Sequence, residues 1–259
     1  TFTNPILFEN HSQEEKETYS GTLRILAEAF GPAREPESEI TQQHMDIAAS
    51  LQAAVQASLL QILRHFKQET GQENLCMAGG VALNCTANSV IKRSRLFNKT
   101  FIQPASGDDG TAIGAALYVQ RQHEPELPPK KMGQPLWGPR FSDEQIREVL
   151  DERDDCEYTY FDSFEEYAKQ IAQLIADGKI IGWFQGNMEF GPRALGGRSI
   201  LGDPRHPEMR DKINALVKKR EWFRPFAPAV AAEAASKFIE IDEGDEAPDA
   251  DIGEQEPEK

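Results

Sequence analysis

The segment of the chain that carries the most candidate chemistry runs from Glu189 to Pro228. It holds nine Lys and Arg residues against five Asp and Glu residues, a net charge of about +4 in a protein whose formal net charge is -15. Cations that stand against the average sign of a chain favour a local anion-binding site. Arginine suits flat anions such as phosphate or carboxylate, because its donors form a rigid fork.

Two arginines of this segment are held in turns. Arg193 lies in GPRALGGRS, and Arg224 lies in FRPFAP, where a following proline restricts the backbone. An alternative is that the arginines form ordinary ion pairs at the surface, which suits Arg210 and Lys212 on an expected helix better than it suits Arg193 and Arg224. The acids available as partners are Glu189, Asp203, Asp211 and Glu221.

A glycine turn in the first half of the chain is a candidate ligand site. The sequence MAGGVALN places Gly79 and Gly80 between an expected strand and an expected helix. Glycine lets a ligand approach the backbone closely, and the amides at a helix N-terminus favour anions. A tight structural turn explains the two glycines equally well, so both interpretations stay open.

A second turn, SGDDGT, carries two adjacent carboxylates, Asp108 and Asp109. Carboxylates at a strand-to-helix turn can bind a hard cation or act as a base. One of them can instead cap the helix that follows. The two residues can also divide these roles.

The elements that must position these residues fall into two regions. In the first, a helix over His44–Thr70 is followed by two strand–glycine turn–helix units, a pattern typical of an α/β fold. A proline-rich segment, 125–139, is the expected domain linker. In the second region, Ser142 and Gln145 form an expected capping box. A helix over 163–177, the strand KIIGWFQG and a helix over 206–219 follow.

The bulk composition narrows the class of protein. The chain has 259 residues, enough for one large domain or two ordinary ones, and its negative charge argues against general nucleic-acid binding. No apolar run reaches about 18 residues, so no membrane span is expected, and the N-terminus lacks the pattern of a signal peptide. Three cysteines without metal-ligand spacing indicate a reduced, cytoplasmic setting. Residues 240–259 hold ten acids and one lysine, and we expect them to form a mobile, solvated tail.

Four motifs along the chain resemble the motifs of one protein family. MAGGVALN, QPASGDDGTAIGAAL, GPRALGGRSILGDPR and KKREWFRPFAP are similar, in that order, to the C-terminal part of NodU/CmcH-type O-carbamoyltransferases. The resemblance implies a partial actin/Hsp70-like (Kae1-like) ATPase domain over 1–124 and, after the linker, a YrdC-like α/β domain over 140–259.

The resemblance also implies a reaction. Carbamoyl phosphate and ATP would give a carbamoyl adenylate in the YrdC-like domain. The carbamoyl group would then pass to a hydroxyl of a small molecule or sugar in a biosynthetic pathway, beside a divalent metal ion, commonly iron. The expected partner is thus a small-molecule acceptor, with no nucleic acid and no membrane.

Carried onto this chain, the resemblance assigns roles to single residues. Three cations match the carbamoyl phosphate site: Arg193, Lys218 and Arg224. The adenosine-side motif matches Gly79, Gly80 and Asn84. Asp108 matches a metal ligand, but Asp109 stands where the family usually has a small residue, so which aspartate binds the metal stays open. The family's metal site also uses a His-x-x-x-His pair, which this sequence lacks.

Because the His-x-x-x-His pair is missing, we expect a C-terminal fragment that binds carbamoyl phosphate weakly at best and does not transfer the carbamoyl group by itself. Two other interpretations stay open. One is a hydrogenase-maturation or tRNA threonylcarbamoyl-type transferase, against which stand the missing zinc-finger cysteine pairs and the absence of a basic face. The other is a non-catalytic nucleotide-binding module whose arginine loop contacts an acidic partner.

Overall fold

The computed structural model describes residues 12–36, 38–128 and 132–239. The predicted acidic tail, 240–259, lies outside the described residues. The chain divides into two compact units, Thr1–Ile62 and Leu63–Lys259. The domain boundary predicted at the proline-rich linker stays a prediction.

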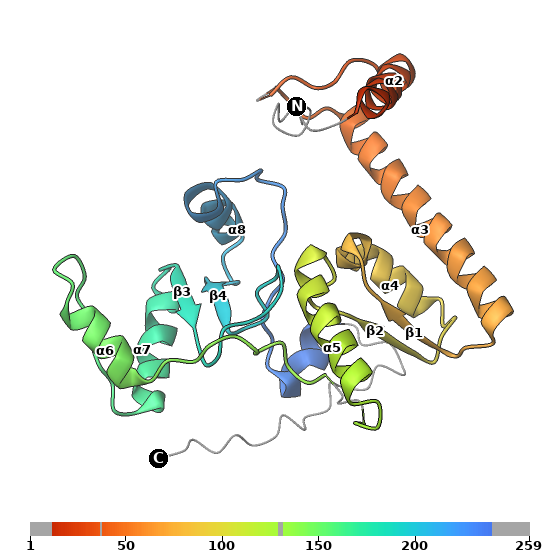
Figure 1. The fold of residues 1–259 in the computed structure, drawn as a ribbon. Coiled ribbons are helices and arrows are strands. Elements are labelled where there is room, and N and C mark those ends of the chain that lie inside the picture. The colour runs from red at the N-terminus through yellow and green to blue at the C-terminus, as the bar shows by residue number, and fades with distance from the viewer. Residues whose placement is uncertain (1–11, 37, 129–131, 240–259) are drawn as a thin grey trace. The chain divides into compact units, whose positions relative to one another are not determined.

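Two long helices dominate the N-terminal part of the chain. Helix α2 spans Gln13–Phe30 and helix α3 spans Gln42–Thr70 (Figure 1). The helix predicted over His44–Thr70 is therefore confirmed, with a start two residues earlier. Gly71 ends the helix, because its φ of 66° leaves the helical region while its N–H still donates to the Lys67 carbonyl at 2.9 Å.

The apolar stripe of α3 is not covered by the described residues. Leu51 is 65% exposed and Phe66 is 57% exposed, and no residue of α3 is buried. By length and composition alone α3 could cross a membrane, with a mean hydropathy of 1.2 over 18 residues. One such helix is weak evidence, because soluble core helices pass the same test. The absence of a membrane span stays a prediction.

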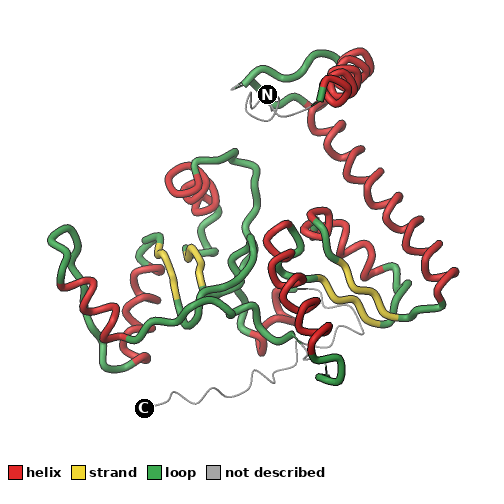
Figure 2. The backbone as a smooth tube through the Cα atoms, viewed as in Figure 1, coloured by secondary structure: helices red, strands yellow, loops and turns green. Residues whose placement is uncertain are grey.

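The first strand pair sits in the middle of the chain. Strands β1 (Asn74–Met77) and β2 (Lys99–Ile102) lie side by side (Figure 2) and pair in parallel. The crossover between them contains the 3-10 turn η1 (Gly80–Leu83) and helix α4 (Cys85–Arg93). After β2 come the 3-10 turn η2 (Asp108–Gly110) and helix α5 (Thr111–His123). This confirms the two strand–turn–helix units and the α/β character.

The second region begins as the sequence predicts. Helix α6 (Asp143–Asp151) starts at a complete capping box, in which Ser142 Oγ accepts from the Gln145 N–H and Gln145 Oε1 accepts from the Ser142 N–H. Helix α7 spans Phe164–Ala176 and gives way to Gly178.

The arginine-rich segment of the chain contains one strand of an antiparallel pair, a short helix and a π-helical turn. Strand β3 (Ile181–Phe184) pairs with β4 (Arg198–Leu201). Helix α8 covers only Glu208–Ile213, and a π-helical turn, η3, covers Asn214–Lys218. The helix predicted over 206–219 is confirmed as one helical run over 208–218, whose second half is π-helical, and it ends at Lys219, which adopts a left-handed φ of 46°. The short elements η4 (Ala232–Ala234) and α9 (Ala235–Phe238) follow.

Candidate anion-binding site

The loop between β3 and β4 is organised around one buried acid. Glu189 is only 5% exposed, and its Oε1 accepts hydrogen bonds from the backbone N–H groups of Leu195, at 3.0 Å, and Gly197, at 2.7 Å. Its Oε2 lies 3.4 Å from Arg198 Nε. Arg198 in turn donates to the carbonyl oxygens of Gly191 and Arg193. The Glu189 carboxylate and the Arg198 guanidinium therefore both stabilise the backbone of this loop.

The structure pairs each of the four acids named as possible partners with an arginine. Apart from Glu189, the pairs are Asp203 with Arg205 at 2.6 Å, Asp211 with Arg210 at 2.9 Å, and Glu221 with Arg224 at 2.7 Å. The ion-pair alternative therefore describes Arg224 as well as Arg210. Any role of Arg224 toward a ligand would start from this half-exposed pair.

The Asp203 pair is the strongest of these. The Asp203 side chain is 2% exposed and accepts from the side chain and the backbone N–H of Arg205. These hydrogen bonds lower the pKa of the carboxyl to about 2. The carboxylate thus fixes the turn that leads from β4 into α8.

A buried amide organises the loop that carries Arg224. Asn214 is 1% exposed, and its Nδ2 donates to the carbonyl oxygens of Trp222, at 3.2 Å, and Arg224, at 3.0 Å. Its Oδ1 accepts from Arg220 Nε at 2.7 Å. The Arg220 guanidinium also lies over the Phe226 ring, 4.6 Å from the ring centre. Asn214 therefore sets the path of the chain around Arg224.

Two of the predicted cations keep unpaired side chains. In the described part of the chain, neither Arg193 nor Lys218 has a side-chain hydrogen bond or ion pair. Both are exposed. No hydrogen bond joins either of them to Arg224 within those residues. Arg193 projects from a loop fixed by Glu189, and Lys218 belongs to the π-helical turn that follows Asn214.

The two glycine-containing turns of the first region meet. The Gly79 N–H donates to the Ser106 carbonyl at 2.7 Å. Asn84 caps helix α4, because its Oδ1 accepts from the Ala87 N–H at 3.0 Å. The structure thus gives Asn84 a capping role, and Gly79 and Gly80 remain exposed at the turn.

The loop between β3 and β4, residues 185–197, carries Arg193 and is called the arginine loop. It packs against the turn that follows β2. Gly191 has a φ of 119°, and a Cβ placed on it would stand 3.2 Å from the Pro104 carbonyl oxygen and 3.5 Å from the Ala105 Cβ. Glycine therefore allows two segments far apart in sequence to touch. Residues 104–105 lead directly to Asp108, so this contact brings the arginine loop to the same turn as the predicted metal ligand.

Asp108 lies exposed in η2, and its backbone carbonyl accepts from Thr111 Oγ1 at 2.5 Å. Within the described ranges, no three His, Cys, Asp or Glu side chains gather closely enough to hold a metal ion. Asp108 and Asp109 alone do not fit a complete metal site.

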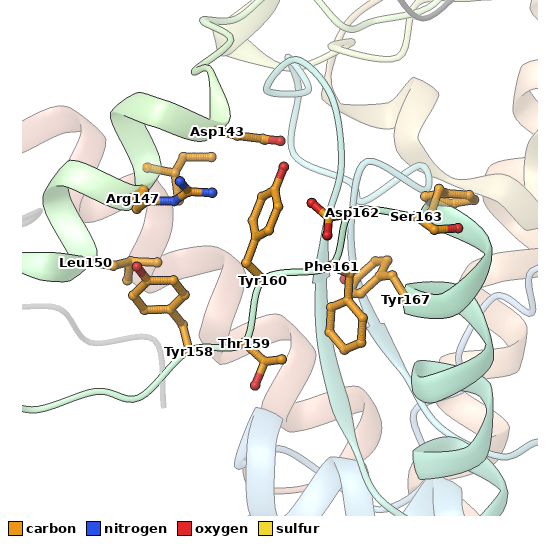
Figure 3. Close-up of a pocket in the computed structure, with 12 residues that line it drawn as sticks. Asp143, Arg147, Leu150, Tyr158, Thr159, Tyr160, Phe161, Asp162, Ser163 and Tyr167 are labelled. Carbon is orange, nitrogen blue, oxygen red and sulfur yellow. The ribbon is translucent and has the colours of Figure 1, made fainter.

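A cavity of about 540 Å³ lies elsewhere, among residues of α6, α7 and the segment between them. Figure 3 shows Tyr160 within its lining, and the Arg147 guanidinium lies over that ring at 4.5 Å. The lining includes none of the residues that the sequence predicts for ligand binding. The candidate anion site is therefore separate from this cavity, and its cations Arg193 and Lys218 are exposed.

Sequence reasoning missed the residues that hold these loops. Glu189, Asp203 and Asn214 entered it only as ion-pair partners or not at all, although each is a polar residue beside apolar or glycine neighbours. That pattern is a weak signal of burial.

Comparison with known proteins gives one consistent family. The profile described as Carbamoyltransferase N-terminus matches residues 12–117, and the profile described as Carbamoyltransferase C-terminus matches residues 172–249. The chain is 47% identical to the uncharacterized protein sll1178 of Synechocystis, over 86% of this chain and 37% of that protein. It is 44% identical to nodulation protein NolO of Bradyrhizobium diazoefficiens, over 87% of this chain and 42% of that protein.

A further relative, nodulation protein U of Azorhizobium caulinodans, is 32% identical over 75% of this chain and 33% of its own length. The chain spans well under half the length of these curated relatives.

Proposed function

The chain belongs to the carbamoyltransferase family, a family of transferase enzymes, and from that membership we propose that it forms part of an ATP-dependent O-carbamoyltransferase. Carbamoyl phosphate is the proposed donor and ATP the proposed activating nucleotide. A carbamoyl adenylate is the proposed intermediate. Hydrolysis of carbamoyl phosphate would give carbamate and release inorganic phosphate, and attack of the carbamate on the α-phosphate of ATP would form the adenylate and release pyrophosphate. Attack by a hydroxyl of a small molecule or sugar then forms the carbamate ester and releases AMP. The proposed setting is the cytoplasm.

The observation that carries this proposal is the presentation of Arg193. Its guanidinium is exposed and unpaired among the described residues, while Glu189 and Arg198 fix its loop. An unpaired guanidinium on a fixed loop can bind a phosphate without first breaking an ion pair, and its side chain loses rotamer freedom only when it binds. The proposed role of the cation is to bind and orient the acyl phosphate, by positioning and electrostatics.

The other predicted residues take supporting roles in the proposal. Lys218 would add a second free positive charge, and Arg224 would exchange its Glu221 partner for the phosphate. Gly79 and Gly80 would approach the adenosine side, next to the helix that Asn84 caps. The two family profiles match one region each. We propose a partial Kae1-like fold for the first region and a YrdC-like fold for the second.

A divalent metal, iron by resemblance, is proposed for the full-length protein alone. Asp108, or its neighbour Asp109, would supply one ligand from the described residues, and the others would have to come from elsewhere. No observation favours the hydrogenase-maturation, tRNA-modifying or non-catalytic interpretations. Cys76, Cys85 and Cys156 are free thiols and form no paired site.

Pyrophosphate release tests the proposal. The full-length protein is incubated with ATP in the presence and absence of carbamoyl phosphate. We expect release that requires carbamoyl phosphate and falls at least about tenfold in Arg193→Ala, since a hydrogen bond to a charged group is lost. Arg210→Ala, whose guanidinium is paired with Asp211, is the matched control and should keep the wild-type rate. Pyrophosphate release at the same rate with and without carbamoyl phosphate would refute carbamoyl phosphate as the donor.

A further inference from the structure

The backbone of the arginine loop forms a small anion-binding nest that is already filled. The N–H groups of Leu195 and Gly197 converge on one oxygen, Oε1 of Glu189, at 3.0 and 2.7 Å. Convergent backbone N–H groups in a glycine-containing turn are a typical receptor for an anion. Here the anion belongs to the chain itself, and it is 95% shielded from solvent, since Glu189 is 5% exposed.

The loop fits this carboxylate closely. A Cβ placed on Gly197 would stand 3.2 Å from both Cγ and Oε1 of Glu189, and also 3.2 Å from Leu136 Cδ2. A side chain at position 197 would therefore push against the acid or against Leu136. The third glycine of the GPRALGG sequence, Gly197, is thus explained by its contact with the Glu189 carboxylate, without a ligand.

The second carboxylate oxygen governs a neighbouring arginine. Oε2 of Glu189 is buried and makes no hydrogen bond among the described residues, but it lies 3.4 Å from Arg198 Nε. The far end of the Arg198 guanidinium donates to the carbonyl oxygens of Gly191 and Arg193. Arg198 is therefore engaged on both sides, and it ties down the backbone of Arg193 while the Arg193 side chain stays free.

We propose that Glu189 is a positioning residue whose carboxylate acts as the internal anion of the loop and holds Arg193 in place for carbamoyl phosphate. The inference rests on the proposed function, because it names how that site is built. It also carries a consequence for recognition. The Leu195 and Gly197 amides are occupied, so the ligand phosphate is bound by the Arg193 side chain and gains nothing from these two amides.

Substitution of Glu189 in the full-length protein tests this inference. Glu189→Ala empties the nest, leaves two amides without their acceptor and Arg198 without its ion-pair partner, so the Kd for carbamoyl phosphate should rise at least about tenfold. Glu189→Gln keeps an oxygen for both amides and should lose clearly less. Formate should partly restore binding to Glu189→Ala by entering the empty nest, but it should not restore Arg193→Ala. Glu166→Gln, at an exposed position of α7, is the matched control.

Hydrogen exchange of the Leu195 and Gly197 amides supplies a readout independent of the ligand. Both should exchange slowly in the wild type and in Glu189→Gln, and fast in Glu189→Ala. Wild-type binding by a folded Glu189→Ala variant, or equally slow exchange in it, would overturn the inference. If Glu189→Ala fails to fold, Glu189→Gln decides the question. Near-wild-type carbamoyl phosphate binding and amide exchange in Glu189→Gln would support the inference. A loss of binding in Glu189→Gln as complete as in Arg193→Ala would overturn it. Absence of binding by the wild type refutes the proposed function, and amide exchange still shows whether Glu189 holds the loop.

Discussion

The side-chain amide of Asn214 donates a hydrogen bond to the backbone carbonyl of Arg224 at 3.0 Å. The same amide donates to the Trp222 carbonyl, and its oxygen accepts from Arg220. One buried side chain thus fixes three positions of a loop that contains little regular structure. The loop that carries Arg193 is built the same way, around Glu189. In both cases a buried polar residue orders a surface segment.

Asn214→Ala should destabilise the protein by about 2–4 kcal/mol, because two carbonyls and a guanidinium lose their partner in a buried setting. Urea unfolding measures the free energy. Asn98→Ala is the control, since the Asn98 amide bonds to Glu73 at an exposed site. It should cost less than about 0.5 kcal/mol. Equal costs for the two variants would show that Asn214 does not order the 220–224 loop.

Asp203 should make stability fall in acid. Its pKa is about 2 in the folded protein, against an ordinary value of 3.8, because Arg205 donates to it. As pH falls below 3.8 the unfolded state takes up the proton first, so the folded state loses this contribution between pH 3.8 and about 2. Urea unfolding across that window should show a weaker pH dependence in Asp203→Asn than in the wild type. An identical pH dependence in both proteins would contradict this account.

Comparing Gly191→Ala with Gly196→Ala separates the cost of backbone strain from the cost of disturbing the contact between Gly191 and residues 104–105. Both glycines have positive φ, 119° and 114°, so both substitutions carry the cost of a left-handed residue, about 1–2 kcal/mol. A Cβ at Gly196 meets nothing within 4 Å, whereas one at Gly191 meets the Pro104 carbonyl. Gly191→Ala should therefore cost about 1 kcal/mol more in urea unfolding. No excess cost would mean that the loop does not pack on the 104–105 turn.

Local chemistry made the helix ends predictable from sequence. The Ser142–Gln145 capping box and the stop at Gly71 depend on residues within one turn of the helix, so the pattern alone identifies them. The α/β character followed in the same way from strand–turn–helix order. Arg210 forms the local ion pair expected of an arginine beside an acid on a helix.

The parts that escaped prediction depend on contacts between distant segments. Strand β4 was missed because its partner β3 lies beyond the 189–198 loop, and a short sequence of mixed polarity does not indicate such pairing. The pairing of Arg224 with Glu221 was underestimated, although the two are three residues apart. The contact of Gly191 with Pro104 joins residues from two regions, and neither the GPRALGG sequence nor the QPASGDD sequence predicts it.

Binding of carbamoyl phosphate, followed by isothermal titration calorimetry, tests the central claim most directly. The proposal predicts micromolar to millimolar binding by the folded full-length protein. It predicts at least about a tenfold loss in Arg193→Ala, smaller losses in Lys218→Ala and Arg224→Ala, and no change in Arg210→Ala. The Arg224 loss should be smaller because Glu221 already competes for that guanidinium. Absence of binding in a folded sample, or binding that Arg193→Ala leaves intact, would contradict the account.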